Sequence, residues 1–167
     1  TAAAIDRNGW FHTGDAGYLK DSHLYLTERI KDLFKTSNGK YISPQALETK
    51  LAIDRYIDQI AVIADERKFV SALIVPVYGF VKDYAKEKGI AYSNMDELLQ
   101  HPKIQALFRA RIDTLQQQFA HYEQVKRFTL LTEPFSMERG ELTNTLKLKR
   151  SVVAKNYKGL IDKMYEE

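Results

Sequence analysis

Two apolar stretches in the first half of the chain predict the centre of a small sheet. Residues 59–64 and 70–75 are almost wholly apolar, and the charged segment Asp65-Glu66-Arg67-Lys68 separates them. Apolar runs of this length that are bounded by a polar turn are typical of strands buried on both faces. They therefore predict a buried hairpin, and a further short strand is predicted at residues 127–132.

Segments with the residue spacing of helices precede and follow these strands. Ser43-Pro44 predicts a helix start, because serine caps the first turn and proline suits the first helical position. Apolar residues at 80–85 predict a second helix, and Gly89 can end it in the left-handed conformation. Asn94 predicts another cap. The sequence thus favours an α+β fold, a short sheet with flanking helices.

A longer apolar stripe follows Pro102, which predicts the start of a helix. Its side chains recur at three- and four-residue intervals and predict one helix with a core-facing stripe, through Ile104, Leu107, Phe108, Ile112, Leu115, Phe119 and Tyr122. A loop with Pro134 and Gly140 comes after the last strand. One final helix is predicted from Ser151 to Tyr165.

The first thirty residues have a different pattern. Residues 10–28 predict a hairpin, with glycines in the first strand, a turn at Asp21-Ser22 and alternation through Leu24 and Leu26. This segment has too little apolar surface for a core of its own. We therefore expect residues 1–30 to be the end of a larger upstream domain and residues 31–167 to form a small domain, so that the chain is a piece of a longer protein.

Composition narrows the class of protein. With 167 residues, 44% hydrophobic and 28% charged, the chain suits one globular domain that carries a piece of another. Its apolar runs fall well short of the ~20 residues of a membrane-spanning helix. The sequence has no cysteine, which excludes disulfides and thiol nucleophiles and fits a reducing compartment. A cytoplasmic location is therefore expected.

The net charge of +3 is unevenly distributed. Basic residues are concentrated near the end of the chain, at Lys147, Lys149, Arg150, Lys155, Lys158 and Lys163. A solvated helix face explains such a cluster, and so does contact with phosphates or an anionic lipid surface. A noncatalytic binding module for acidic partners or nucleic acid is the alternative function class. The four histidines have no metal-ligand spacing, and no metal site is predicted.

Three segments carry candidate chemistry. In Thr13-Gly14-Asp15-Ala16-Gly17, glycines on both sides present a carboxylate that can accept two hydrogen bonds from a vicinal diol. A turn at Ser37-Asn38-Gly39 permits close backbone approach to a ligand. Lys147 lies in a polar loop before a helix, from which it can reach phosphate oxygens. Each of these three segments, taken by itself, also has a structural explanation. The first can be a surface turn, the second an ordinary strand-turn-helix connection, and the third a solvated loop.

The order of the motifs is more specific than any one of them. The chain reads Gly-Trp-Phe-His-Thr-Gly-Asp-Ala-Gly at 9–17, Arg-Ile-Lys-Asp-Leu-Phe-Lys at 29–35 and Leu-Lys-Leu-Lys-Arg at 146–150. This series resembles the adenylate-forming enzymes, and within them it is most similar to long-chain fatty acid–CoA ligases. The resemblance implies the C-terminal lid domain of such an enzyme, preceded by a hairpin of its large domain.

The resemblance also implies roles for individual residues. Asp15 would hold the ribose hydroxyls of ATP, and Arg29 would assist there. Lys31 matches the hinge about which the small domain turns, and Gly39 matches the glycine that lines the pantetheine tunnel. Lys147 matches the lysine that reaches the α-phosphate and the substrate carboxylate during adenylation.

Lys149 is the alternative to Lys147. Many relatives have glycine before the adenylation lysine, whereas Leu146 stands there in this chain, and Asn144 replaces a common proline. Lys147 is favoured because Lys149-Arg150 then falls where relatives place the basic start of the last helix.

The implied reaction has two steps and uses ATP, CoA and Mg²⁺. A fatty carboxylate attacks the α-phosphorus of ATP and releases pyrophosphate, and the CoA thiol then attacks the acyl carbon and releases AMP. The phosphate loop, the acyl pocket and the metal ligand would lie in the upstream large domain, so the isolated chain is expected to be inactive. The implied partners are that domain and the fatty acid, with peripheral membrane contact and no nucleic acid.

Overall fold

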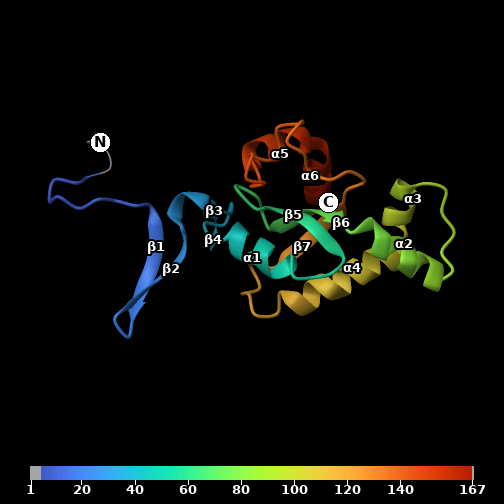
Figure 1. Ribbon diagram of the computed structural model, residues 1–167, viewed down its shortest axis with the longest axis horizontal. Helices are drawn as coiled ribbons and strands as arrows, with labels where there is room; N and C mark the ends of the chain where they lie inside the picture. The colour runs from blue at the N-terminus through green and yellow to red at the C-terminus, as the bar shows by residue number, and fades with distance from the viewer. Residues whose placement is uncertain (1–4, 167) are drawn as a thin grey trace.

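The computed structural model describes residues 5–166, without the side chains of Thr27, Glu28 and Lys31. Within these residues a β1–β2 hairpin extends away from a small domain that is built around strands β5, β6 and β7 (Figure 1). The elements are β1 Asp15–Lys20, β2 His23–Arg29, the 3-10 turn η1 Ile30–Asp32, β3 Phe34–Lys35, β4 Tyr41–Ile42, α1 Pro44–Leu51, β5 Ile57–Ile63, β6 Val70–Pro76, α2 Tyr78–Glu87, α3 Met95–Gln100, α4 Pro102–Leu115, β7 Val125–Leu130, α5 Arg150–Asn156 and α6 Lys158–Tyr165.

The sheet of the small domain is short and buried. β6 pairs antiparallel with β5 and parallel with β7, which gives the order β5-β6-β7. Every residue of β6 is buried, because apolar clusters cover both faces of the sheet. Ile74 packs in the cluster that includes residues of α1 and α4, whereas Leu73 packs with residues of α5 and α6. The predicted α+β fold and the buried β5–β6 hairpin are confirmed.

The local signals at helix ends are also confirmed. The Ser43 hydroxyl accepts a hydrogen bond from the Ala46 N–H at 3.4 Å, and Pro44 is the first residue of α1. The Asn94 side chain accepts one from the Glu97 N–H at 2.9 Å at the start of α3. Gly89, with φ of 62°, takes the left-handed conformation after α2. Each of these signals is satisfied by residues within the same turn.

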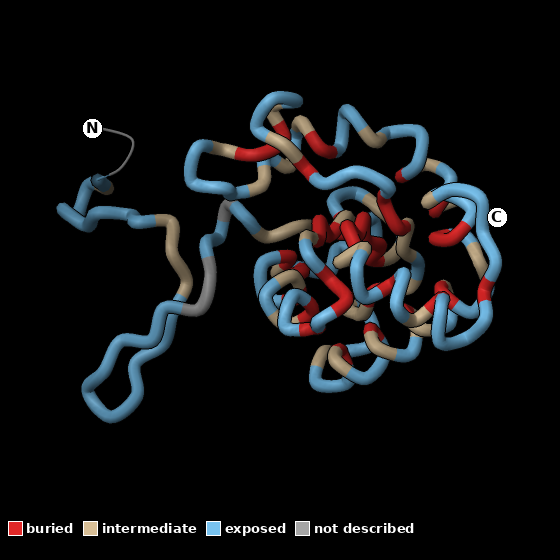
Figure 2. The backbone as a smooth tube through the Cα atoms, turned by 45° about the vertical axis from the view of Figure 1, so that its right-hand side comes forward, coloured by how far each residue is buried: buried red, intermediate tan, exposed pale blue. Residues whose placement is uncertain are grey.

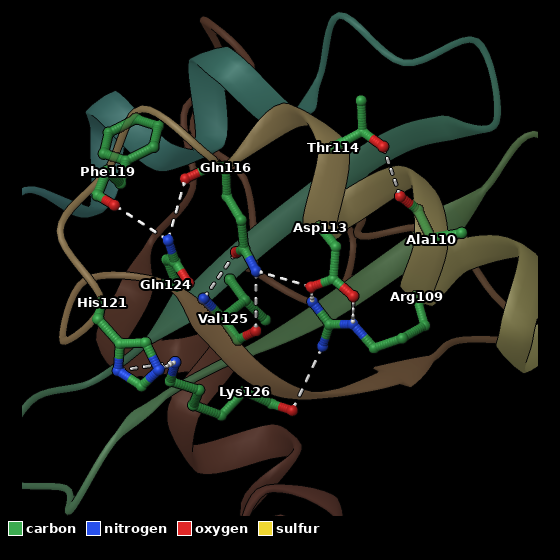
Figure 3. A network of polar contacts seen from close by, with 10 residues as sticks. All are labelled: Arg109, Ala110, Asp113, Thr114, Gln116, Phe119, His121, Gln124, Val125 and Lys126. Atoms are coloured by element: carbon green, nitrogen blue, oxygen red, sulfur yellow. Dashed lines mark hydrogen bonds and ion pairs between the residues drawn. The ribbon is translucent and has the colours of Figure 1, made fainter.

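Helix α4 is shorter than the apolar stripe after Pro102 predicts. α4 ends at Leu115, and Gln116 begins a different structure. The Gln116 side chain accepts a hydrogen bond from the Val125 N–H at 2.8 Å and donates to Asp113 at 3.1 Å (Figure 3). The prediction of one helix through Phe119 and Tyr122 was therefore wrong. Gln116 ties the end of α4 to the start of β7, and the chain turns back between them.

The final helix is two helices. α5 ends at Asn156 and α6 begins at Lys158, with Tyr157 between them at φ of −104° and ψ of 17°. The Tyr157 ring packs edge-on against Phe135, with the ring centres 5.7 Å apart. The prediction of one helix from Ser151 to Tyr165 was therefore wrong, because a tertiary contact accompanies a bend that the periodicity does not reveal. None of the helices among the described residues is long and apolar enough to cross a membrane.

The β1–β2 hairpin has its predicted turn but begins later than expected. Asp21 and Ser22 have φ of 49° and 62°, as in the two-residue turns whose twist suits a hairpin. The first strand begins at Asp15 rather than near Trp10. Apolar side chains of the hairpin are exposed, with Leu19 at 76%, and Figure 2 shows residues 17–26 in the colour of exposed residues. The described side chains of the hairpin thus form no core of their own, as predicted.

Candidate functional site

A cavity of about 800 Å³ lies between the hairpin and the small domain. Residues that are far apart in the sequence line it together: Asp15, Leu26, Arg29, Asp32, Gln45, Glu48, Leu146, Lys147, Leu148 and Arg150. Three of the site residues expected from the sequence, Asp15, Arg29 and Lys147, are among them. The fold therefore brings the first and last motifs to one place.

Asp15 and Arg29 face each other at the end of the hairpin. Asp15 is the first residue of β1 and pairs with Arg29, the last residue of β2. The Arg29 Nε lies 3.2 Å from the Asp15 Oδ1. The Gly14 carbonyl accepts a hydrogen bond from the Ile30 N–H at 2.8 Å, and Gly14 has φ of 78°. A carboxylate beside a guanidinium offers acceptors for hydroxyl groups and a cation for an oxyanion.

Lys147 stands at the end of a tight turn. The Thr143 N–H donates to the Lys147 carbonyl at 2.8 Å, and the Lys147 N–H donates to the Thr143 hydroxyl at 3.0 Å. Leu146 has φ of 59°, which is unusual for a residue with a side chain. The Lys147 side chain is exposed. The turn thus fixes the backbone of Lys147 and leaves a flexible side chain that can carry a positive charge to a ligand.

A buried carboxylate supports this turn. Glu141 is fully buried and accepts hydrogen bonds from Arg139 Nε at 3.1 Å, Asn156 at 3.1 Å and the Ser136 N–H at 3.0 Å. Burial alone raises the pKa of Glu141, but the bonds from Arg139, Asn156 and the Ser136 N–H outweigh burial and lower the pKa below its ordinary value. Glu141 is therefore held as a carboxylate. No periodicity in the sequence marks it, because the residue lies in a loop.

A second ion pair lines the cavity itself. Arg150, the first residue of α5, holds Glu48 of α1 through two contacts of 2.6 Å each. Glu48 also accepts a hydrogen bond from the Val62 N–H at 2.8 Å. The sequence places Arg150 at the end of the basic motif 146–150 but gives it no partner, and nothing near Glu48 singles that residue out. Their spacing of 102 residues explains why no local signal could have paired them.

The remaining predicted residues lie elsewhere. Gly39 is in the turn between β3 and β4, where φ is 75° and its N–H donates to the Thr36 carbonyl at 2.8 Å. Neither Gly39 nor Lys149 is among the residues that line the cavity. The backbone of Lys31 lies in η1, but its side chain is outside the described part of the structure. Across the described residues, no group of three or more His, Asp or Glu side chains could hold a metal ion.

Comparison with known proteins identifies the small domain. Residues 31–167 match the family model described as AMP-binding enzyme C-terminal domain. Long chain acyl-CoA synthetase 7, peroxisomal, of Arabidopsis thaliana is 34% identical over 171 residues, with 100% of this chain and 24% of that protein covered. Long-chain-fatty-acid–CoA ligase 5 of Rattus norvegicus is 35% identical over 173 residues, covering 99% of this chain and 25% of that protein. The chain thus spans about a quarter of these relatives.

Solved structures agree on the fold. The adenylation domain of a carboxylate reductase from Mycobacterium chelonae superposes with a TM-score of 0.79 at 23% identity, over 99% of this chain and 24% of that one. A Mycobacterium tuberculosis fatty acyl CoA synthetase gives 0.54 at 21% identity, over 95% of this chain and 26% of that one. With the family match over most of its length, the chain belongs to the family of AMP-binding enzyme C-terminal domains.

Proposed function

We propose that this chain is the C-terminal part of an ATP-dependent long-chain fatty acid–CoA ligase. The observation that carries the proposal is the cavity that Asp15, Arg29 and Lys147 line together. The names of the relatives, which are long-chain acyl-CoA synthetases and ligases, support the substrate class. The reaction joins a fatty acid to CoA at the expense of ATP, with AMP and pyrophosphate as products.

Asp15 binds the ribose of ATP in this proposal. An ionised carboxylate can accept hydrogen bonds from two vicinal hydroxyls, and it can do so beside an arginine that already holds one of its oxygens. The Asp15–Arg29 contact at 3.2 Å supports this arrangement, because it fixes the carboxylate at the rim of the cavity. Arg29 assists at the same ribose by orienting the carboxylate.

Lys147 acts in the adenylation step. The fatty carboxylate and the triphosphate repel each other, so a cation between them orients the pair and stabilises the charge that develops at the α-phosphate. The position of Lys147 at the cavity supports its assignment over Lys149, which does not line the cavity. Lys147 lies on a tight turn and has a long side chain, which suits a group that must reach into a closed site.

CoA reacts at a second surface of the small domain. Gly39 lies apart from the cavity, and a Cβ built on it meets no atom within 4 Å. A domain that turns about Lys31 would bring Lys147 to the nucleotide for the first step and Gly39 to the pantetheine arm for the second. The start of the family match at residue 31 supports a division into residues 1–30 of the large domain and residues 31–167 of the lid.

The rest of the protein completes the site. The large domain would supply the phosphate loop, the acyl pocket and the Mg²⁺ ligand, as the resemblance to long-chain fatty acid–CoA ligases implies. We propose a cytoplasmic enzyme that touches membranes peripherally, because the exposed lysines of α5 and α6 can meet anionic lipid headgroups where fatty acids partition.

The test separates the two half-reactions in the full-length protein. Lys147→Ala should reduce acyl-adenylate formation, measured by pyrophosphate exchange, by about 100-fold or more, as the loss of one transition-state donor does elsewhere. The same variant should still convert supplied acyl-adenylate and CoA to thioester. Lys149→Ala is the matched control and should keep both activities. Loss of adenylation in the Lys149 variant alone would reassign the lysine, and loss in neither would overturn the proposal.

A further inference from the structure

We infer that Arg150 is a positioning residue for adenylation, because its ion pair with Glu48 keeps that carboxylate from capturing Lys147. The inference rests on the proposed function and adds a role that Lys147, Asp15 and Arg29 do not cover. It begins from the composition of the cavity wall, where Lys147 and Glu48 line the same space.

The Glu48 carboxylate is strongly anchored. It belongs to α1, is 13% exposed, and accepts a hydrogen bond from the Val62 N–H at 2.8 Å, which ties it to β5. A carboxylate with so little solvent needs a cation, since an unpaired charge in that position is costly. Arg150 supplies that cation through two contacts of 2.6 Å, one to each oxygen. The planar guanidinium satisfies both oxygens at once, which a lysine cannot do.

Among the described residues, Lys147 and Arg29 are the other cations that line this cavity, and Arg29 already contacts Asp15. Lys147 lies three positions before Arg150 in the chain. Without Arg150, the Glu48 carboxylate would attract the Lys147 ammonium, because opposite charges in a partly desolvated site pair strongly. A lysine held by Glu48 would no longer stand between the fatty carboxylate and the α-phosphate. Arg150 thereby leaves Lys147 free for the substrates.

Arg150 is itself fixed in place. Its guanidinium lies 5.5 Å from the centre of the Phe34 ring, and it is the first residue of α5. Phe34 packs against the apolar cluster that includes Leu47 and Leu51 of α1. The guanidinium is thus placed by Glu48 on one side and an aromatic ring on the other, and in this inference it acts on Lys147 by way of Glu48.

The experiment uses three variants of the full-length enzyme, assayed for each half-reaction. Arg150→Ala should lower the rate of acyl-adenylate formation by about 10- to 100-fold, as expected for a displaced catalytic group, and should leave thioester formation from supplied acyl-adenylate within about 3-fold. The double variant Arg150→Ala with Glu48→Gln should recover most of the adenylation rate, because the competing carboxylate is gone. Arg150→Lys keeps a cation beside Glu48 and should lose little adenylation.

A matched control comes from a second buried pair. Arg111 contacts Asp54, which is 5% exposed and also accepts a hydrogen bond from a backbone N–H, that of Tyr56 at 2.8 Å. This pair does not line the cavity. Arg111→Ala should lower the melting temperature, as Arg150→Ala also should, and affect both half-reactions alike.

Recovery of adenylation in the double variant supports the inference only together with selective loss of adenylation in Arg150→Ala. Glu48→Gln also removes an unpaired, mostly buried charge, so it would reverse a purely structural loss too, but that loss would affect both half-reactions. Equal loss of both half-reactions in Arg150→Ala, or no recovery on adding Glu48→Gln, would overturn the inference. If the Arg150→Ala protein does not fold, Arg150→Gln, which keeps a polar side chain without the charge, is compared with and without Glu48→Gln. No loss of adenylation in Arg150→Gln, or a loss that Glu48→Gln does not reverse, overturns the inference. Failure of the proposed function is seen separately, as a Lys147→Ala enzyme that still forms acyl-adenylate.

Discussion

Arg139 and Glu141 form an ion pair directly before the turn that carries Lys147. The Arg139 Nε lies 3.1 Å from each oxygen of the Glu141 carboxylate, which is fully buried. The Glu141 carbonyl also accepts a hydrogen bond from the Lys149 N–H at 2.8 Å, just beyond the turn. One residue therefore holds both ends of the segment that presents the catalytic lysine of the proposed reaction.

Replacement of Glu141 should destabilise the small domain. In Glu141→Gln the charge-assisted bonds from Arg139 and Asn156 are lost or weakened, and an amide replaces an acceptor in a buried site. We expect the free energy of unfolding to fall by about 1–3 kcal/mol, measured by urea denaturation. Glu133→Gln is the control, because Glu133 contacts the same arginine but is 74% exposed, and it should change stability by less than about 0.5 kcal/mol. Similar losses in both variants would contradict this role.

The same carboxylate should make stability depend on acid pH. Its pKa is lower in the folded protein than the value of 4.5 that applies when it is unpaired. A group of this kind contributes stability that is fully present above pH 4.5 and is lost as the pH falls below that value through the folded pKa. Denaturation at pH 7 and below pH 4.5 should show the difference between wild type and Glu141→Gln narrowing in acid. A constant difference would contradict the expectation.

Leu146 is held in a conformation that disfavours its side chain. Its φ of 59° costs about 1–2 kcal/mol for a residue with a Cβ, and glycine avoids that cost while losing about 0.5–1 kcal/mol of chain entropy. Because Leu146 is 67% exposed, little packing is lost on truncation. Leu146→Gly should therefore raise the free energy of unfolding by up to about 1 kcal/mol, whereas Leu146→Val should lower it, since branching at Cβ worsens the conflict. Chemical denaturation of the pair gives the sign, and a less stable glycine variant would refute the argument.

Just after the end of α4, the Gln116 side chain is a hydrogen-bond partner for backbone groups of Val125. Its amide accepts from the Val125 N–H at 2.8 Å and donates to the Val125 carbonyl at 3.4 Å. Gln116→Ala leaves these buried backbone groups unpaired and should cost about 1–3 kcal/mol of unfolding free energy. Gln117→Ala changes an exposed neighbour of the same type and should be nearly neutral. An equal response of the two positions in thermal denaturation would show that the contact is unimportant.

Two substitutions at Gly39 can distinguish backbone strain from obstruction of the proposed pantetheine tunnel. The φ of 75° at Gly39 penalises most side chains, but asparagine tolerates the left-handed region. Gly39→Asn and Gly39→Leu should both impair thioester formation from supplied acyl-adenylate, the leucine by more, while acyl-adenylate formation persists. A leucine variant that loses only stability would contradict a place for Gly39 beside pantetheine.

The sequence predicts those parts of the fold that depend on neighbouring residues. The caps at Ser43 and Asn94 and the turn at Asp21-Ser22 are each formed within a few residues, so their patterns are sufficient. The end of α4 is not predicted in this way. It depends on the hydrogen bond between Gln116 and Val125, and Phe119 beyond the helix still packs against the core, so it continues the apolar spacing without being helical.

The same limit applies to the site. Motif order predicts that Asp15, Arg29 and Lys147 belong together, and they line one cavity. The carboxylates that support them, Glu48 and Glu141, are invisible to pattern because their partners are set by tertiary structure. Charged residues in loops and on helices resemble ordinary surface residues until the fold shows that they are buried.

The parallel pairing of β6 with β7 has a consequence for the order of folding. β5 and β6 are joined by a short turn and can pair early, but β7 can join β6 only after the chain from Val70 to Val125 has closed into a loop that contains three helices. Pairing over such a separation is slow, because loop closure comes before any gain in contacts. We therefore expect β7 to dock late in the folding reaction. The turn of Lys147 follows β7 in the chain, so Lys147 would be among the last residues to reach its place.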